Sequence, residues 1–358
     1  MIRFIHLADV HLGAVPDRGC PWSHEREEEI WDTFRRFIAG IRKNPVDLLF
    51  IAGDLFHRQP LPGELEEVNS LFASIPDTRV FLMAGSHDYI RKESFYKDFR
   101  WESNVTFFRG ETPECVEIPE KNVFVYGMSY EHPEISEPVY DSMRPQQKPG
   151  FHVLLAHGGD ESHIPMDFTA LSKAGFDYLA LGYYHSPQII MRDRALYAGA
   201  LEPTDSNDTG EHGFIEGEYE QGILKTRLVP FACRSYQNLV LTVREESSQY
   251  SLEEMLRNDI MKRGGKNMYR IVIRGRRSPE TRFLGERLKN MGNIVEVLDE
   301  SRPSYDLGEL RRKYRGTLIG DYIEYFRQKE DSVVEQKALY HGLQALLDAA
   351  VFTGDRKK

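Results

Sequence analysis

Residues 48–57 read LLFIAGDLFH, and this stretch decides the fold class. Its first five residues are all apolar, which predicts a buried strand. A glycine ends the apolar run, and Asp54 and His57 follow it closely. Because ligand-binding and catalytic groups of α/β proteins gather at the carboxyl ends of strands, the stretch predicts an α/β fold with a functional site where this strand ends.

The same pattern, an apolar run that ends in polar residues, recurs elsewhere in the first half of the chain. The runs and their polar residues are RFIHLADVH with Asp9 and His11, FLMAGSHD with Ser86, His87 and Asp88, HVLLAH with His157, and YLALGYYH with Tyr183 and His185. Imidazoles and carboxylates without cysteine suit manganese, iron or zinc, and an aspartate can bridge two ions. Each motif alone could equally be a turn beside a buried histidine. Their joint order predicts one metal site to which five strand ends contribute.

The order of the predicted elements indicates how the strands are layered. Residues 24–43 and residues 62–74 have the composition and spacing of helices, and each lies between two apolar runs. Later runs follow one another with turn signals and few helices between them. We therefore expect a core of two sheets with helices packed outside.

A boundary is predicted near residue 234, because the pattern beyond it changes. Strand-like and helix-like segments alternate there as β-α-β-α-β, and a charged helical tail follows. We expect three parts: 1–233, 234–305 and 306–358. The tail segments TLIGDYIEYF (317–326) and KALYHGLQALLDAAVF (337–352) carry apolar stripes. Such stripes either pack on the chain itself or bind a partner.

The composition limits the location and the partners of the chain. The formal net charge is −10, so any contact with nucleic acid must be local, for example through Arg91 and Lys92 or through RGRR at 274–277, unless these are merely solvated charges. The three cysteines have no CxxC spacing and suggest no disulfide framework. No apolar run is long enough for a membrane span, and the first residues lack the pattern of a signal peptide. We expect a cytoplasmic protein.

The order DxH, GDxxH, GxHD, HG and GxxH resembles that of the calcineurin-like metallophosphoesterases, and within them the SbcD-type nucleases of DNA double-strand break repair. The resemblance covers residues 1 to about 230. GDLFHRQ (53–59), GALEPTD (199–205) and the later GEHGF favour the nuclease branch, as do the appended domain and tail. The resemblance implies a two-sheet β-sandwich flanked by helices, a small β-α-β-α-β capping domain and a helical C-terminal tail.

The resemblance also implies an activity and a set of site residues. It implies hydrolysis of DNA phosphodiester bonds, as an exonuclease or endonuclease, with one or two divalent ions that are typically manganese, with iron or zinc as alternatives. The first ion would be held by Asp9, His11, Asp54 and His185, and the second by Asp54, His157 and Ser86. His87 would act on the leaving oxygen and His57 would help to position the substrate, while we expect Asp88 to order the loop. Implied partners are DNA, an SbcC-like SMC-type ATPase and a second copy of the chain.

Two positions depart from the motifs of the family, and both concern the second ion. Ser86 stands where the family has asparagine, and Tyr183 replaces the first histidine of GHxH. A serine hydroxyl is shorter than an amide, and a phenol ligates well only if the metal lowers its pKa. Asp160 or His163 could supply a replacement ligand, or Tyr183 could simply fill space.

These departures leave two other functions open. One is a catalytically weakened subunit that binds DNA and bridges to the ATPase. The other is a phosphatase or phosphodiesterase for small molecules, although a small substrate does not require the appended domain and tail.

Overall fold

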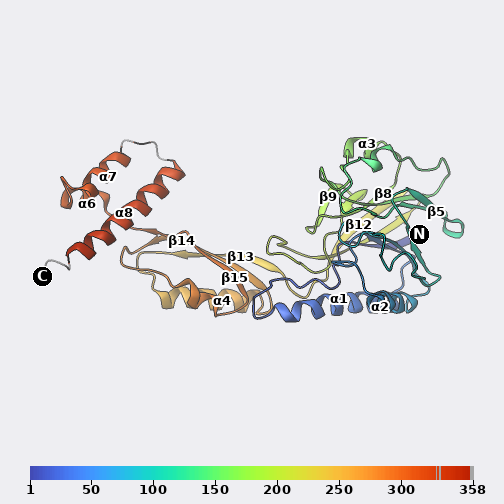
Figure 1. The fold of residues 1–358 in the computed structure, drawn as a ribbon, viewed down its shortest axis with the longest axis horizontal. Coiled ribbons are helices and arrows are strands. Elements are labelled where there is room, and N and C mark those ends of the chain that lie inside the picture. The colour runs from blue at the N-terminus through green and yellow to red at the C-terminus, as the bar shows by residue number, and fades with distance from the viewer. Residues whose placement is uncertain (328, 330–331, 355–358) are drawn as a thin grey trace. The chain divides into compact units, whose positions relative to one another are not determined.

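The computed structural model describes residues 1–327, 329 and 332–354 (Figure 1). The end of the predicted tail, 355–358, lies outside these residues. Contacts divide the chain into two compact units, the first comprising Met1–Gln237 with Lys266–Met268 and the second the other residues from Asn238 onward. This division groups the tail with the small domain, and the finer division at 233 and 305 stays a prediction.

The first sheet of the first unit has the strand order β12-β11-β1-β2-β3-β4. Its strands are β1 (Ile2–Leu7), β2 (Leu48–Ala52), β3 (Arg79–Met83), β4 (Val105–Phe107), β11 (Gly213–Glu220) and β12 (Ile223–Pro230). From β1 to β4 neighbouring strands are parallel, whereas β11 pairs antiparallel with both β1 and β12. The apolar run that opened the sequence is β2, a central strand that is buried along its whole length.

The second sheet has the order β5-β6-β7-β8-β10-β9. Its strands are β5 (Glu114–Ile118), β6 (Val123–Gly127), β7 (Phe151–His157), β8 (Tyr178–Gly182), β9 (Gln188–Met191) and β10 (Ala195–Tyr197). The central strands β6, β7, β8 and β10 are parallel, and the two edge strands are antiparallel to their neighbours.

The two sheets pack face to face, as predicted. Phe4, Phe50 and Phe81 of the first sheet lie in one buried cluster with Val153 and Tyr178 of the second. The outer face of the first sheet is covered by α1 (Ser23–Lys43) and α2 (Pro62–Ala73), whose apolar stripes are buried against it. The outer face of the second sheet packs against loops and a short helix, α3 (Phe168–Ser172), and two 3-10 turns, η1 (Pro119–Lys121) and η2 (Val139–Ser142), lie in the connections.

The second unit begins with the predicted β-α-β-α-β order. Its elements are β13 (Tyr236–Val243), α4 (Gln249–Arg263), β14 (Met268–Arg277), α5 (Gly285–Lys289), β15 (Ile294–Asp299) and the short β16 (Arg302–Pro303). Leu241, Leu256 and Ile271 belong to its own buried core.

Three further helices form the tail of the second unit: α6 (Leu307–Lys313), α7 (Leu318–Arg327) and α8 (Val333–Gly354). Ile319 and Ile323 of α7 pack on Leu343 of α8, so part of each apolar stripe is buried within the chain. Leu318 and Tyr325 on α7 remain largely exposed. Every helix within the described residues is too short or too polar to cross a membrane.

Candidate metal centre

The sheet topology brings the five predicted strand ends to one place. β1, β2 and β3 are parallel neighbours in the first sheet, and β7 and β8 are parallel neighbours in the second. Two hydrogen bonds join the sheets at these ends: the Tyr183 N–H donates to the Asp9 carboxylate, and His157 Nδ1 lies 2.9 Å from the Ala52 carbonyl oxygen. The residues after all five strands therefore share one site, as the sequence predicted.

The backbone at this site is unusual for residues with a side chain. Asp9, His11 and Asp54 have φ of 50°, 52° and 48°, and Tyr183 has φ of 112°. Positive φ is costly for residues other than glycine, and such residues concentrate at functional sites. Four of the nine described residues other than glycine that have positive φ thus follow β1, β2 and β8 at this edge of the sandwich.

Asp9, His11 and His185 form the first group of side chains that could hold an ion. One ligand atom of each lies within 4.8 Å of those of the other two. The Nε2 atoms of His11 and His185 are 2.9 Å apart. Asp9 and His11 are completely buried, so their carboxylate and imidazole donors are shielded from bulk water.

His185 is oriented by two residues for which we predicted no role. Its Nδ1 lies 3.1 Å from Asp208 Oδ2 and 3.1 Å from Thr204 Oγ1. A carboxylate at Nδ1 favours a proton there and leaves the Nε2 lone pair for a metal. Thr204 lies in the GALEPTD motif. Asp208 lies in the loop that follows this motif, and no periodic pattern in the sequence indicated a role for it.

Asp9, Asp54 and His157 form the second group, which shares Asp9 with the first. The Nδ1 of His157 faces the Ala52 carbonyl, so Nε2 is the ring nitrogen that a metal could bind. That Nε2 is buried without a hydrogen-bond partner and lies 3.4 Å from Asp54 Oδ2. A buried nitrogen without a hydrogen-bond partner beside carboxylates fits a bound cation.

Asp54 belongs to the second group and also approaches the first. Its Oδ2 is 3.9 Å from His11 Nε2 on one side and 3.4 Å from His157 Nε2 on the other. A β-carbon at Gly85 would come within 2.3 Å of Asp54 Oδ1, so the glycine of GSHD is needed for this close approach. The position is that of a carboxylate able to bridge two ions.

The electrostatics of the centre also fit a cation. Burial raises the pKa of Asp9 to about 6, against the opposing charges of His157 and His185. Burial acts to raise the pKa of Asp54 as well, but His157 and His11 outweigh it and hold that pKa far below its usual value. Burial lowers the pKa of His11. Positive charge on neighbouring imidazoles, above all on His157, therefore stabilises the Asp54 carboxylate, and a divalent ion bound here would supply that compensating charge instead.

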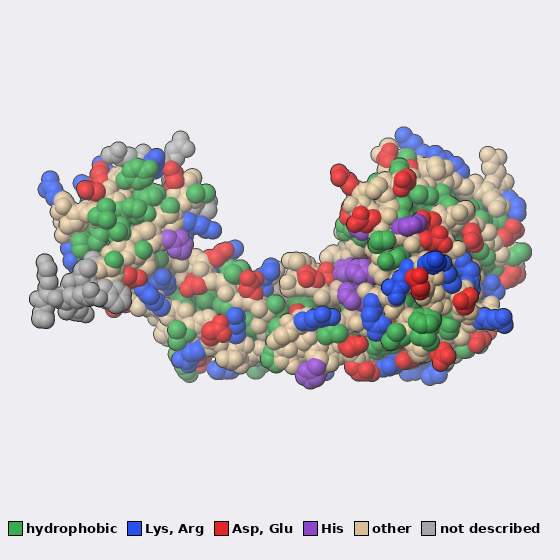
Figure 2. Space-filling model, in the orientation of Figure 1, with side chains coloured by type: hydrophobic (Ala, Val, Ile, Leu, Met, Phe, Trp, Pro, Cys, Tyr) green, Lys and Arg blue, Asp and Glu red, His purple; other side chains and the backbone are tan. Residues whose placement is uncertain are grey.

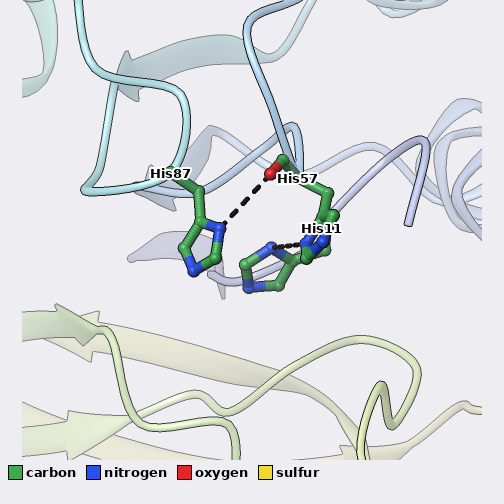
Figure 3. A group of neighbouring side chains, drawn as sticks. All are labelled: His11, His57 and His87. Carbon is green, nitrogen blue, oxygen red and sulfur yellow. Dashed lines mark hydrogen bonds between the residues drawn. The ribbon is translucent and has the colours of Figure 1, made fainter. Parts of the chain in front are cut away.

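His57 and His87 lie at the exposed side of the centre, next to His11 (Figure 3). The His87 N–H donates to Asp54 Oδ1 over 2.9 Å, and its Nδ1 lies 3.3 Å from the His57 carbonyl oxygen. The two rings are stacked with centroids 5.1 Å apart, and His57 Nδ1 is 3.3 Å from His11 Nδ1. With Nδ1 engaged, His87 can present Nε2 to a substrate.

Asp88 orders the loop that carries His87, as we expected. Its buried carboxylate accepts hydrogen bonds from the Gly85 N–H (2.8 Å), the Phe56 N–H (3.2 Å) and the Tyr96 hydroxyl (2.8 Å). These bonds join the loops after β2 and β3, so His57 and His87 keep their relative positions.

Ser86 and Tyr183 are the two residues that differ from the family motifs. Neither has its side chain placed as a ligand in the candidate groups. Ser86 Oγ lies 3.5 Å from Asp54 Oδ2. The Tyr183 hydroxyl donates to Asp160 Oδ2 and lies 3.0 Å from His163 Nδ1. Burial, and then the hydrogen bond to Asp160, raise the pKa of the Tyr183 phenol. The structure thus brings Asp160 and His163 to Tyr183, and not into these two groups or into the third group that could hold an ion, His11, His57 and His87.

Comparison with known proteins agrees with this architecture. The family model described as calcineurin-like phosphoesterase matches residues 2–192, more than half of the chain. The chain therefore belongs to the calcineurin-like phosphoesterase family, whose members hydrolyse phosphoester bonds and depend on divalent metals. The predicted family and its two-sheet fold are confirmed.

Among curated relatives, an uncharacterized metallophosphoesterase YhaO of Bacillus subtilis (strain 168) is 25% identical over 304 residues, 76% of this chain and 72% of that protein. The DNA double-strand break repair protein Mre11 of Methanopyrus kandleri is 27% identical over 259 residues, 62% of this chain and 55% of the relative. Mre11 of Saccharolobus solfataricus is 24% identical over 319 residues, 77% and 76% of the two chains. The predicted resemblance to the repair-nuclease branch agrees with these relatives.

Proposed function

We propose that the chain is a metal-dependent nuclease subunit that hydrolyses phosphodiester bonds of DNA during double-strand break repair. The observation that carries this proposal is the pair of neighbouring ligand groups that share Asp9, with Asp54 between His11 and His157 and two histidines exposed beside them. The Mre11 relatives support DNA as the substrate.

The ligand sets follow from the geometry and the resemblance together. Asp9, His11, Asp54 and His185 would hold one divalent ion, and Asp54 and His157 would face a second. When bound, such an ion stabilises charge on the phosphate and lowers the pKa of a bound water. Manganese is the ion that the resemblance favours.

The remaining catalytic and positioning roles would belong to three side chains, those of His87, His57 and Asp208. His87 would protonate or stabilise the leaving oxygen, because it is exposed beside the ligands and its Nδ1 is already engaged. His57, stacked on His87, would position the substrate, and Asp208 would keep His185 oriented.

DNA, an SMC-type ATPase and a second copy of the chain are the proposed partners. Figure 2 shows histidine side chains gathered on the surface of the first unit with Lys and Arg side chains near them. Arg91 and Lys92, on the loop after Asp88, are exposed and would attract phosphate groups. The exposed Leu318 and Tyr325 of α7 support the tail as the surface for the ATPase.

A weakened DNA-binding subunit of the same complex is the second candidate. It is favoured by the Tyr183 hydroxyl, which is hydrogen-bonded to Asp160 rather than directed to the ligand groups.

The proposal is tested with the full chain, Mn²⁺ and two substrates, linear DNA and bis(p-nitrophenyl) phosphate. His87→Ala should lower cleavage of DNA by roughly 10²–10⁴-fold, as expected when proton transfer is lost, and should lower hydrolysis of the small ester by less, because nitrophenolate leaves without a proton, with metal content unchanged. His24→Ala, at an exposed histidine on α1, is the matched control.

Three outcomes would contradict the proposal in different ways. DNA cleavage that survives His87→Ala removes the role of His87, and cleavage that survives complete chelation removes the metal centre. Hydrolysis of the small ester without cleavage of DNA would favour the small-molecule phosphodiesterase.

A further inference from the structure

The centre has a first side, formed by the first group of candidate ligands, and a second side, formed by the second group. These two sides offer an ion different numbers of donors. Among the described residues, the carboxylates and imidazoles on the second side are Asp9, Asp54 and His157, and Asp9 also belongs to the first group. A second ion would therefore share Asp9 and Asp54 with the first and have His157 alone to itself. Further donors would have to come from Ser86 and Tyr183.

The hydroxyl of Tyr183 is held in a closed cluster with Asp160 and His163. It donates to Asp160 Oδ2, while Asp160 Oδ1 accepts from the Ser162 N–H (2.9 Å) and the His163 N–H (2.8 Å). His163 Nδ1 lies 2.9 Å from Asp160 Oδ1, and its ring packs on the Tyr183 ring with centroids 4.9 Å apart. Both carboxylate oxygens of Asp160 are thus occupied.

The loop that carries this cluster is itself firmly placed. The Gly159 N–H donates to the His163 carbonyl over 2.7 Å, and the Ile164 N–H donates to the Ile135 carbonyl over 2.7 Å. A β-carbon at Gly158 would come within 2.2 Å of the His163 carbonyl oxygen, so the tight turn requires glycine there. Asp160 cannot turn toward His157 without breaking these contacts.

Tyr183 is also fixed from the side of the first group. Its N–H donates to both oxygens of Asp9, at 3.1 and 3.0 Å, and its ring stands edge-on to His157 with centroids 5.7 Å apart. The aromatic ring lies beside His157 while the hydroxyl points to Asp160, so the residue fills space on the second side without directing its hydroxyl to the ligands.

We propose that the cluster of Tyr183, Asp160 and His163 withholds its donors from the second metal position, so that the chain retains a single divalent ion at Asp9, His11, Asp54 and His185. The inference rests on the proposed function and deepens it, because it sets the number of ions with which the chain works.

The test measures metal per chain, not activity. The full chain is loaded with Mn²⁺, passed through a desalting column and analysed by elemental analysis and electron paramagnetic resonance. We expect one ion with the six-line spectrum of isolated Mn²⁺, because a pair separated by roughly 3.5–4 Å would couple magnetically.

Tyr183→His is the variant that should open the second position. An imidazole lacks the hydroxyl that Asp160 accepts and adds a nitrogen donor beside His157, so metal content should rise to two coupled ions. Tyr183→Phe is the matched control: it also loses the bond to Asp160, but its ring offers no donor and the backbone N–H groups of Ser162 and His163 still hold Asp160, so it should keep one ion.

The results distinguish a failure of this inference from a failure of the proposed function. Two ions of similar affinity in the wild-type chain would overturn this inference and leave the proposed function intact, whereas no bound ion would overturn the metal centre itself. A folded Tyr183→His chain with one ion would also overturn it. If that variant unfolds in a thermal melt, the wild-type count still decides.

Discussion

The two sides of the centre differ in how their ligands are supported. On the first side, Asp208 and Thr204 contact His185, and the Tyr183 N–H holds Asp9. On the second side, His157 is held by its Nδ1, but Tyr183 directs its hydroxyl elsewhere and Ser86 is at the limit of hydrogen-bond distance from Asp54. The side chains on the first side are thus held by more hydrogen bonds than those on the second, in agreement with the single ion that we propose.

The largest effect is expected from Asp54→Asn, because Asp54 lies between both sides. The loss of its charge should lower metal affinity by more than the roughly 10–100-fold typical of a residue that only orients a ligand. Manganese titration by calorimetry, together with hydrolysis of the small ester, measures this. Asp98→Asn, an exposed aspartate on the loop after β3, is the control, and equal affinity in both variants would show that Asp54 is no ligand.

A smaller effect is expected from Asp208→Asn, which tests the first side alone. Without the carboxylate at Nδ1, His185 loses its preferred tautomer, and metal affinity should fall by about 10–100-fold. The same titration measures it, and Asp205→Asn, an exposed neighbour that does not contact His185, should bind as the wild type does. An unchanged affinity in Asp208→Asn would contradict the assignment of His185 to the stronger position.

The smallest effect is expected from Ser86→Asn on the second side. An amide oxygen reaches further than a hydroxyl and suits Mn²⁺, but Tyr183 still lacks a free donor, so binding of a second ion should strengthen by less than about 10-fold. Titration at high Mn²⁺ followed by magnetic resonance measures this, with Ser86→Ala as control. If Ser86→Asn strengthened binding of the second ion as much as Tyr183→His does, then Ser86, not Tyr183, would be the residue that limits binding of that ion.

The positions of the candidate residues could be predicted from the sequence where they depend on strand ends. Buried apolar runs locate the ends of β1, β2, β3, β7 and β8, and parallel pairing brings the residues after them together, so Asp9, Asp54 and His157 could be placed from the pattern alone. The two-sheet core and the β-α-β-α-β order followed from the same periodicities.

The parts that could not be predicted depend on loop conformation. Asp208 reaches His185 because its loop turns back, with the Thr204 and Asp205 N–H groups both donating to its carboxylate at 3.0 Å. The direction of the Tyr183 hydroxyl depends on a φ of 112° and on the loop that holds Asp160. Neither leaves a periodic signal. The apolar stripes of the tail were visible in the sequence, but not that Ile323 and Leu343 pack on each other.

The left-handed backbone at Asp9, His11 and Asp54 has a consequence for evolution and engineering. Each such residue costs on the order of 1 kcal/mol relative to a conformation that suits a side chain. Substitutions that relax these turns, above all to glycine, would make the sandwich easier to fold while removing the ligands. Selection for stability alone would therefore erode this centre, and only a requirement for function would maintain these strained residues.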